Sequence, residues 1–427
     1  MSIIRTSMLA GNWQPGQGSG NDNRAALSLR ALSLIGALLL AGGFPGPANA
    51  EDFRFGHAAG EAYRVISTVD EDVYINRQWS HAARIINRIA VKVKQVRADG
   101  AALLEGEFST SMKYSGGLAY VADRMYRSEY WLGPLGHYDI GTQYYMPTVR
   151  HVPTFPGKDI KPGDTWNAPG EERHDFRDDF GIAEPYIIPI DVQYTFRGPG
   201  AYDGKPVDII EARYTVFHQP GRPTSWVAAY PMQIAGYSRQ TLYWDSGSGR
   251  LAGYSEQFRF VFDLSDGRTV EYRGIAGSKV IEAEAMDREE LAREVRDAVA
   301  GIDDIRVETT EGGVTITMEN IQFEADSSVL RPEELEKIAA IAGVLSTIPD
   351  RDILVGGHTA LAGTPQARKE LSVQRARAVA DELIRLGARR AESVTVIGYG
   401  AEKPLASNAT ESGMARNRRV EITILEN

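Results

Sequence analysis

The segment from Gly356 to Val379, GGHTALAGTPQARKELSVQRARAV, joins a Gly-rich turn to a stretch that favours a helix and carries several cations. One cation, Arg375, has the side chain best suited to bind a carboxylate, because its planar guanidinium meets both carboxylate oxygens at once. Taken alone, such an arginine is more often solvated or paired with an Asp or Glu. His358 follows a strand in the same segment, where a structural hydrogen bond is the expected role. These residue types predict that the segment binds an anion.

A second group of chemically capable residues is the acid-rich stretch EERHDFRDDF at 171–180. Oxygen ligands this dense can hold a divalent cation, but the spacing matches neither an EF-hand loop nor a His-x-x-x-His pair. A solvated charged loop is therefore the favoured interpretation. The chain has no G-x-S-x-G elbow, P-loop or dinucleotide fingerprint. We predict no catalytic residue, no metal site and no cofactor, and hence no enzyme.

The elements that position Arg375 follow from the patterning after Val314. Strand 314–323 precedes a helix that begins at Pro332 and ends before Pro349, with Leu335, Ile338, Ala342 and Leu345 on one face. Strand 353–357 precedes a helix from about 365 to 386 that Gly387 ends. Strands at 393–400 and 419–425 complete a βαβαββ order. This predicts a two-layer α/β domain with both helices on one face of a mixed sheet.

Five ordered segments of this region carry a resemblance: IQFEADSSVL, GGHT, LSVQRARAV, VIGYGAEKPLASNAT and NRRVEI. Together they resemble the OmpA-like peptidoglycan-binding domain, which also occurs in peptidoglycan-associated lipoproteins and flagellar stator proteins. The resemblance covers Val314 to Leu425. It implies that the partner is the peptidoglycan stem peptide, bound by the free, zwitterionic end of its diaminopimelate.

The resemblance also implies which residues contact that ligand. In the family an acid follows GHT, and an Arg fifteen residues later binds the carboxylate; here these positions hold Ala360 and Arg375. The base is present and the acid is absent. Arg368 stands where the family often has Asn. The other implied contacts are Phe323, Ala325, Asp326, Ser327, Thr359, Asn417, Arg418 and Arg419.

The loss of the acid leaves three outcomes open. Binding persists through Arg375 and the backbone amides of loop 323–327, with Asp326 or Glu402 supplying the negative charge. Alternatively, the pocket has shifted to another stem-peptide residue or another anionic ligand. In the third case, the fold serves only as a scaffold for protein partners. Removing one partner of a charge-assisted pair costs about 1.5–3 kcal/mol, which weakens binding without abolishing it.

The chain before the OmpA-like region divides into three parts. Residues 1–50 have a basic flank, a short apolar run at 31–44 and the ending Ala48-Asn49-Ala50, which predict a secretory signal peptide; an uncleaved anchor helix is the alternative. Residues 51–282 alternate polar and apolar residues between turns at Asp99-Gly100 and Asp266-Gly267, which predicts a β-rich domain of unknown function. Residues 283–313 predict a connecting amphipathic helix and hairpin.

Composition limits the function further. With 47 Lys+Arg against 57 Asp+Glu the net charge is −10, which argues against a nucleic-acid binder. The chain has no cysteine, so disulfides and thiolate sites are excluded. We expect an exported, non-enzymatic protein of the periplasm or outer membrane that tethers or organises the envelope. Other envelope proteins are further candidate partners, and association with a membrane stays open. The rival hypothesis is an outer-membrane β-barrel with an OmpA-like anchor, since alternation alone does not decide which face meets lipid.

Overall fold

The computed structural model describes residues 51–113, 117–223, 226–282, 286–310, 312–323, 328–349 and 351–426. The predicted signal peptide therefore lies outside the described residues. No helix within these ranges is long and apolar enough to cross a membrane.

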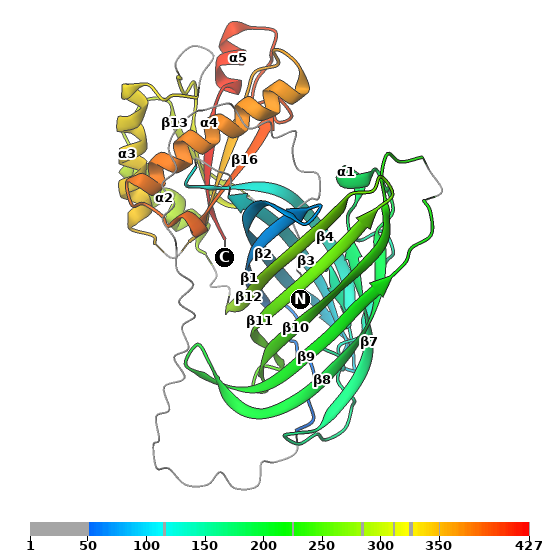
Figure 1. Ribbon diagram of the computed structural model, residues 1–427. Coiled ribbons are helices and arrows are strands. Elements are labelled where there is room, and N and C mark those ends of the chain that lie inside the picture. The colour runs from blue at the N-terminus through cyan, green and yellow to red at the C-terminus, as the bar shows by residue number, and fades with distance from the viewer. Residues whose placement is uncertain are drawn as a thin grey trace, which may run out of the picture.

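The β-rich domain is an antiparallel meander that curls around its own core (Figure 1). The first and last strands pair, because β1 forms ladders with both β2 and β12. Its strands are β1 (Ala62–Ile75), β2 (Gln78–Val96), β3 (Ala102–Lys113), β4 (Tyr120–Leu132), β5 (Tyr138–Ile140), β6 (Val149–Arg150), β7 (Thr165–His174), β8 (Tyr186–Tyr202), β9 (Lys205–His218), β10 (Pro231–Asp245), β11 (Arg250–Leu264) and β12 (Thr269–Glu282), with one short helix, α1 (Arg177–Phe180).

Alternation along these strands separates an apolar interior from a charged exterior. On β11 Phe258, Phe260 and Phe262 are buried, whereas Gln257 and Arg259, on the opposite face of the strand, are exposed. The turns predicted at Asp99-Gly100 and Asp266-Gly267 join β2 to β3 and β11 to β12, and both glycines have positive φ. The N-terminal region is therefore rich in β-structure, as the alternation predicts.

The C-terminal sheet is mixed and carries its helices on one face. Its strand order is β13-β14-β17-β15-β16; β15 and β16 are parallel, and the other neighbours are antiparallel. One face of these strands shares a single apolar core with the helices. The elements are α2 (Arg288–Ala298), β13 (Ile305–Thr310), β14 (Gly313–Met318), α3 (Pro332–Ser346), β15 (Ile353–His358), α4 (Pro365–Arg385), the 3₁₀ turn η1 (Ala391–Ser393), β16 (Val394–Gly400), α5 (Glu411–Asn417) and β17 (Val420–Leu425).

The predicted connector is built into this C-terminal layer. Ala292 and Val295 of α2 and Val307 of β13 belong to the same core as the strands and helices that follow. β13 also pairs along its whole length with β14. The helix and hairpin therefore extend the α/β sheet by one strand.

The two sheets meet at one edge. Tyr120 and Val121 of β4 pair in parallel with Thr395 and Val396 of β16. The Asp381 carboxylate accepts hydrogen bonds from the backbone N–H groups of Leu118 and Ala119, at 2.9 and 2.8 Å. A buried ion pair joins Asp352 to Arg88 and Arg64, with N–O distances of 3.1 and 3.5 Å.

Candidate functional site

Strands β15 and β16 each require a glycine where α4 crosses them, because the helix lies very close to the sheet. A Cβ atom at Gly357 would lie 2.0 Å from the carbonyl oxygen of Ser372, and one at Gly398 would lie 2.5 Å from the Ser372 hydroxyl. The hydroxyl of Ser372 in turn accepts a hydrogen bond from the Gly400 N–H at 2.9 Å. The loop after β15 then caps the next helix, where the Thr364 side chain accepts from the Ala367 N–H. Helix α4 is thereby fixed on the ends of β15 and β16.

Arg375 lies on the turn of α4 that follows Ser372, and the close packing of Ser372 against the strands positions this turn. Its neighbour Ala376 is fully buried and lies 3.1 Å from the Cβ position of Gly357. The guanidinium carbon of Arg375 sits 4.8 Å from the centre of the Phe323 ring, a cation–π arrangement. Phe323 is itself buried and forms a bridge with Leu330. Two residues that the sequence assigned to one site are therefore in contact.

Thr359 and Ala360 are buried at the end of β15. The Thr359 N–H donates to the Gly400 carbonyl at 2.8 Å, while its hydroxyl has no hydrogen-bond partner among the described residues. Ala360 is only 7% exposed, and the next N–H, that of Leu361, donates to Asn408 Oδ1. The position where the family has an acid thus holds a buried methyl group.

Asn417 holds a loop rather than presenting its amide to solvent. Its Oδ1 accepts from the N–H groups of Leu405 and Ala406, and its Nδ2 donates to the Ala406 carbonyl and to Asn408 Oδ1. Since Asn408 Oδ1 also accepts from the Leu361 N–H, hydrogen bonds connect Asn417 to Leu361, the residue after Ala360. Asn417 positions the rim of the site.

Arg419 is buried in a charged network beneath the same loop. It donates to Glu421 Oε1 at 2.7 Å and to the Lys403 carbonyl at 3.0 Å. His358 Nε2 lies 3.2 Å from the other Glu421 oxygen, and its ring stacks on Tyr399. Burial alone would raise the pKa of Glu421, but the contacts with His358 and Arg419 lower it to about 2. Burial lowers the pKa of His358. This residue is only 2% exposed, which fits the structural role expected for it.

The structure does not bring the remaining predicted contact residues that it describes together with Arg375 and Phe323. Arg418 is half-buried and pairs with Glu411 at 3.1 Å. Ala325, Asp326 and Ser327 lie outside the described residues. Glu402, considered as a substitute acid, is exposed.

The acid-rich stretch at 171–180 differs from the predicted solvated loop. Its first four residues end β7, and Glu172 is fully buried, where it binds His174 at 2.8 Å and the Tyr214 hydroxyl at 2.6 Å. The solvated interpretation is wrong here because alternation in β7 turns these side chains into the core.

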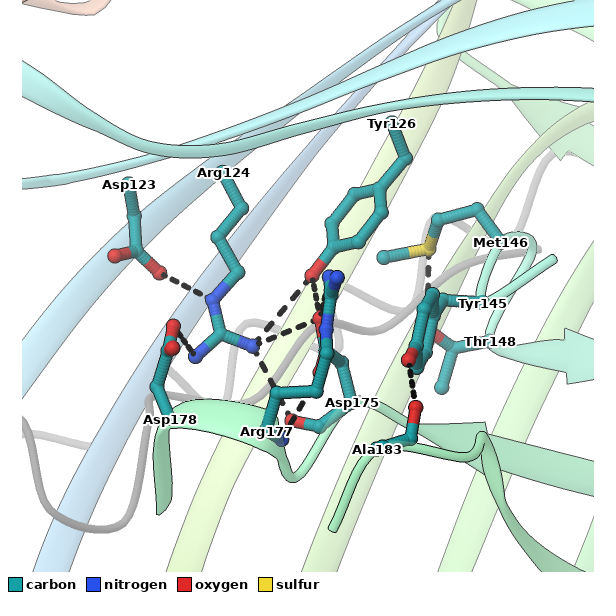
Figure 2. Close-up of polar contacts among 10 residues, drawn as sticks. All are labelled: Asp123, Arg124, Tyr126, Tyr145, Met146, Thr148, Asp175, Arg177, Asp178 and Ala183. Atoms are coloured by element: carbon teal, nitrogen blue, oxygen red, sulfur yellow. Dashed lines mark hydrogen bonds and ion pairs between the residues drawn. The ribbon is translucent and has the colours of Figure 1, made fainter. Parts of the chain in front are cut away.

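The acids that follow β7 are held by arginines instead of forming a metal site. Figure 2 shows that Arg124 forms ion pairs with Asp175 and Asp178, and that Arg177 donates a hydrogen bond to Asp175. Tyr126 donates to the same Asp175 carboxylate at 2.9 Å. No group of three or more His, Asp or Glu side chains in the described part of the chain is arranged to hold a metal ion.

Sequence reasoning missed three residues that build the site: Ser372, Asn408 and Glu421. Ser372 stands in the LSVQRA segment. The available signal was the Gly356-Gly357 pair, because glycines in a strand indicate that another backbone, here that of the helix, comes very close. Glu421 and Asn408 carry no local signal, because their partners lie far away in the sequence.

Known proteins match the C-terminal part of the chain. The model of the OmpA family matches residues 322–418. Outer membrane porin F of Pseudomonas fluorescens is 34% identical over 105 residues, which are 25% of this chain and 32% of that protein. The peptidoglycan-binding protein ArfA of Mycobacterium tuberculosis is 38% identical over 104 residues, 24% of this chain and 32% of that protein.

Among solved structures, the cell wall anchor of the T6SS from Pseudomonas aeruginosa is 31% identical with a TM-score of 0.29, and the match covers 33% of this chain and all of that one. The chain spans about a third of the length of the two curated relatives given above. The stretch that the family model matches lies within the region that holds the five ordered motifs. Residues 322–418 of this chain belong to the OmpA family.

Proposed function

We propose that this chain is a non-enzymatic protein of the bacterial cell envelope, in the periplasm or at the outer membrane. Its OmpA-like module, residues 314–427, docks non-covalently on peptidoglycan and thereby tethers or organises the envelope. The relative ArfA is by name a peptidoglycan-binding protein, and porin F is by name an outer membrane protein. These names support the same general role for the module here.

The observation that carries the proposal is the placement of Arg375. The guanidinium is held over Phe323, on the turn of α4 that packs against the strand leading to Thr359 and Ala360. An arginine positioned by a helix and an aromatic ring is preorganised to bind a planar carboxylate. The ligand is the carboxylate end of a stem peptide, and the Thr359 hydroxyl, which has no hydrogen-bond partner among the described residues, offers a second polar group.

The binding is atypical because Ala360 supplies no charge to the ligand ammonium. Glu421 does not replace the missing acid, since both of its oxygens are engaged by Arg419 and His358. We therefore expect affinity about ten- to a hundredfold below that of a module with an acid at this position.

Co-sedimentation of the purified full chain with peptidoglycan sacculi tests the proposal. Arg375→Ala should abolish pelleting, because it removes the carboxylate-binding group. Arg385→Ala is the matched control: this residue lies on the same helix, is exposed and pairs with Glu382. Failure of the wild-type chain to pellet would favour the second candidate function, a scaffold for protein partners, which the buried alanine at 360 also fits.

The charged exterior of the β-rich domain bears on the rival hypothesis of a lipid-embedded domain. Ion pairs such as Arg84 with Asp70 and Arg197 with Glu211 lie on outward-facing positions of its strands. Strands that face lipid carry apolar side chains outward. The pattern favours a domain whose outer face meets water.

A further inference from the structure

The face of α4 that carries Arg375 holds more positive charge than a zwitterionic ligand needs. Arg368 and Arg375 are seven residues apart in α4, so their side chains leave the same face of the helix two turns apart. Both residues are only partly exposed. The helix begins at Pro365, and its dipole adds positive potential in the first turn, where Arg368 lies. Two guanidinium groups and a helix N-terminus thus favour an anion on this face.

Backbone contacts place Arg368 beside the strand ends that lead to position 360. Its Cβ atom lies 3.6 Å from the Cβ position of Gly400, whose carbonyl accepts from the Thr359 N–H. One Nη atom of Arg368 donates to the carbonyl of Gly363, in the loop that follows Ala360. Its Nε atom is buried and has no hydrogen-bond partner among the described residues. The guanidinium is therefore fixed to the loop after Ala360, with one N–H group that no described residue uses.

The described acids of this module do not offset the extra charge. Both oxygens of Glu421 are already engaged by the buried network beneath the loop. Glu370 and Glu402 are exposed, where water screens their charge. Position 360 itself holds a buried methyl group. A ligand ammonium that came to this position would lose its water without gaining a carboxylate partner, which opposes binding.

We propose that the site selects wall-peptide carboxylates whose neighbouring amine is acylated, and that Ala360 and Arg368 together set this preference. The inference rests on the proposed function, because it concerns the ligand of the same site. Acylation turns the ammonium into a neutral amide and leaves the carboxylate for Arg375. In a cell wall the diaminopimelate amine is acylated where it forms a cross-link. The preferred ligand is therefore a cross-linked peptide, and the free diaminopimelate end is the weaker one.

Titration calorimetry of the full chain with three synthetic stem peptides tests this selection. The first peptide has a free diaminopimelate end, and in the second the amine of that end is acetylated. In the third the amine is acylated by acetyl-alanine, which reproduces the amide bond of a cross-link. The wild type should bind the second and third peptides at least about tenfold more tightly than the first. Arg375→Ala should bind none of them, because it removes the carboxylate-binding group.

Substitutions at position 360 separate charge from size. Ala360→Asp should reverse the preference, because the new carboxylate pairs with the ammonium of the free end. Ala360→Asn adds a side chain of nearly the same size without the charge, and it should not favour the free end.

The contribution of Arg368 has its own variant. Arg368→Asn removes one of the two cations, so the preference for the acylated peptides should shrink severalfold. Arg385→Asn is the matched control, since this residue is exposed near the far end of α4 and pairs with Glu382, and it should leave the preference unchanged.

The outcomes separate this inference from the proposed function. Equal affinity of the wild type for the free and acylated ends, or tighter binding of the free end, would overturn the inference alone, because the peptides would still bind. Binding of the acetylated peptide without the acetyl-alanyl one would overturn the assignment to cross-links. Binding of none of the three by a wild-type chain with a cooperative thermal transition would overturn both proposals. An unchanged preference in folded Ala360→Asp would also contradict the inference.

Discussion

Glu421 shows what a single residue does under the candidate site. Its carboxylate joins Arg419 of the strand start to His358 at the end of β15, so one side chain ties two strands together. Glu421 is 24% exposed, and its partners depend on long-range register, which no local pattern gives. The resemblance implied that Asn417 contacts the ligand; in the structure its side-chain amide bonds to Leu405, Ala406 and Asn408 at the rim of the site.

The lowered pKa of Glu421 predicts acid sensitivity. Because the folded value is about 2 and the ordinary value is 4.5, the unfolded chain binds the proton more readily. Stability from this group is present above about pH 4.5 and is lost as the pH falls towards 2. Between about pH 5 and about pH 3 the free energy of unfolding should fall less in Glu421→Gln than in the wild type, by on the order of 2 kcal/mol.

Guanidinium unfolding followed by circular dichroism at both pH values measures that difference. Glu370→Gln, an exposed residue of α4, is the control and should follow the wild type. Identical pH dependence in Glu421→Gln and the wild type would show that the network contributes no stability.

At the scale of elements, local patterning predicted much of the C-terminal layer. Val420, Ile422 and Ile424 are fully buried as the alternation required, and Gly387 adopts positive φ directly after α4 and the residue that caps it. Leu335 was placed on the buried face of α3 but is 37% exposed, because the first turn of that helix lies at the edge of the core. Ala292 and Val295 lie in the core of the C-terminal layer, a tertiary contact that no local pattern reports.

Two glycine substitutions test how closely α4 must approach the sheet. Gly357→Ala should cost at least about 2 kcal/mol, since its Cβ would meet the Ser372 backbone, which cannot move without shifting the helix. Gly343→Ala, within α3, meets no atom within 4 Å and should stabilise the chain by about 0.5–1 kcal/mol. Chemical denaturation gives both values. A neutral Gly357→Ala would mean that α4, and with it Arg375, is held less tightly than described.

At the scale of the whole molecule, an edge-to-edge contact joins two domains that the sequence treats as separate. The β4–β16 pairing spans only two residue pairs, and Asp352 with Arg64 and Arg88 completes it. Nothing in the local pattern of either domain predicts this junction, because each strand alone reads as an ordinary sheet strand. The sequence alone also did not show that the outer face of the β-rich domain is the charged one, since alternation has the same period whichever face is polar.

Asp352→Ala tests the junction. It leaves two buried guanidinium groups without their shared carboxylate, and burial already lowers the pKa of Arg64. Breaking a buried pair in this way costs about 3–5 kcal/mol. Glu308→Ala is the control, because Glu308 is 50% exposed and pairs with Arg306 at the surface of β13. Calorimetric unfolding should show a loss for Asp352→Ala alone; equal, small effects of both variants would mean that the junction contributes little.

The central claim is that Arg375 still captures a wall-peptide carboxylate although position 360 lacks its acid. Titration calorimetry of the full chain with a stem peptide that carries a free diaminopimelate end measures this directly. The account predicts weak binding by the wild type, binding about ten- to a hundredfold tighter for Ala360→Asp, and none for Arg375→Ala. Absence of binding by both the wild type and a folded Ala360→Asp variant would contradict it.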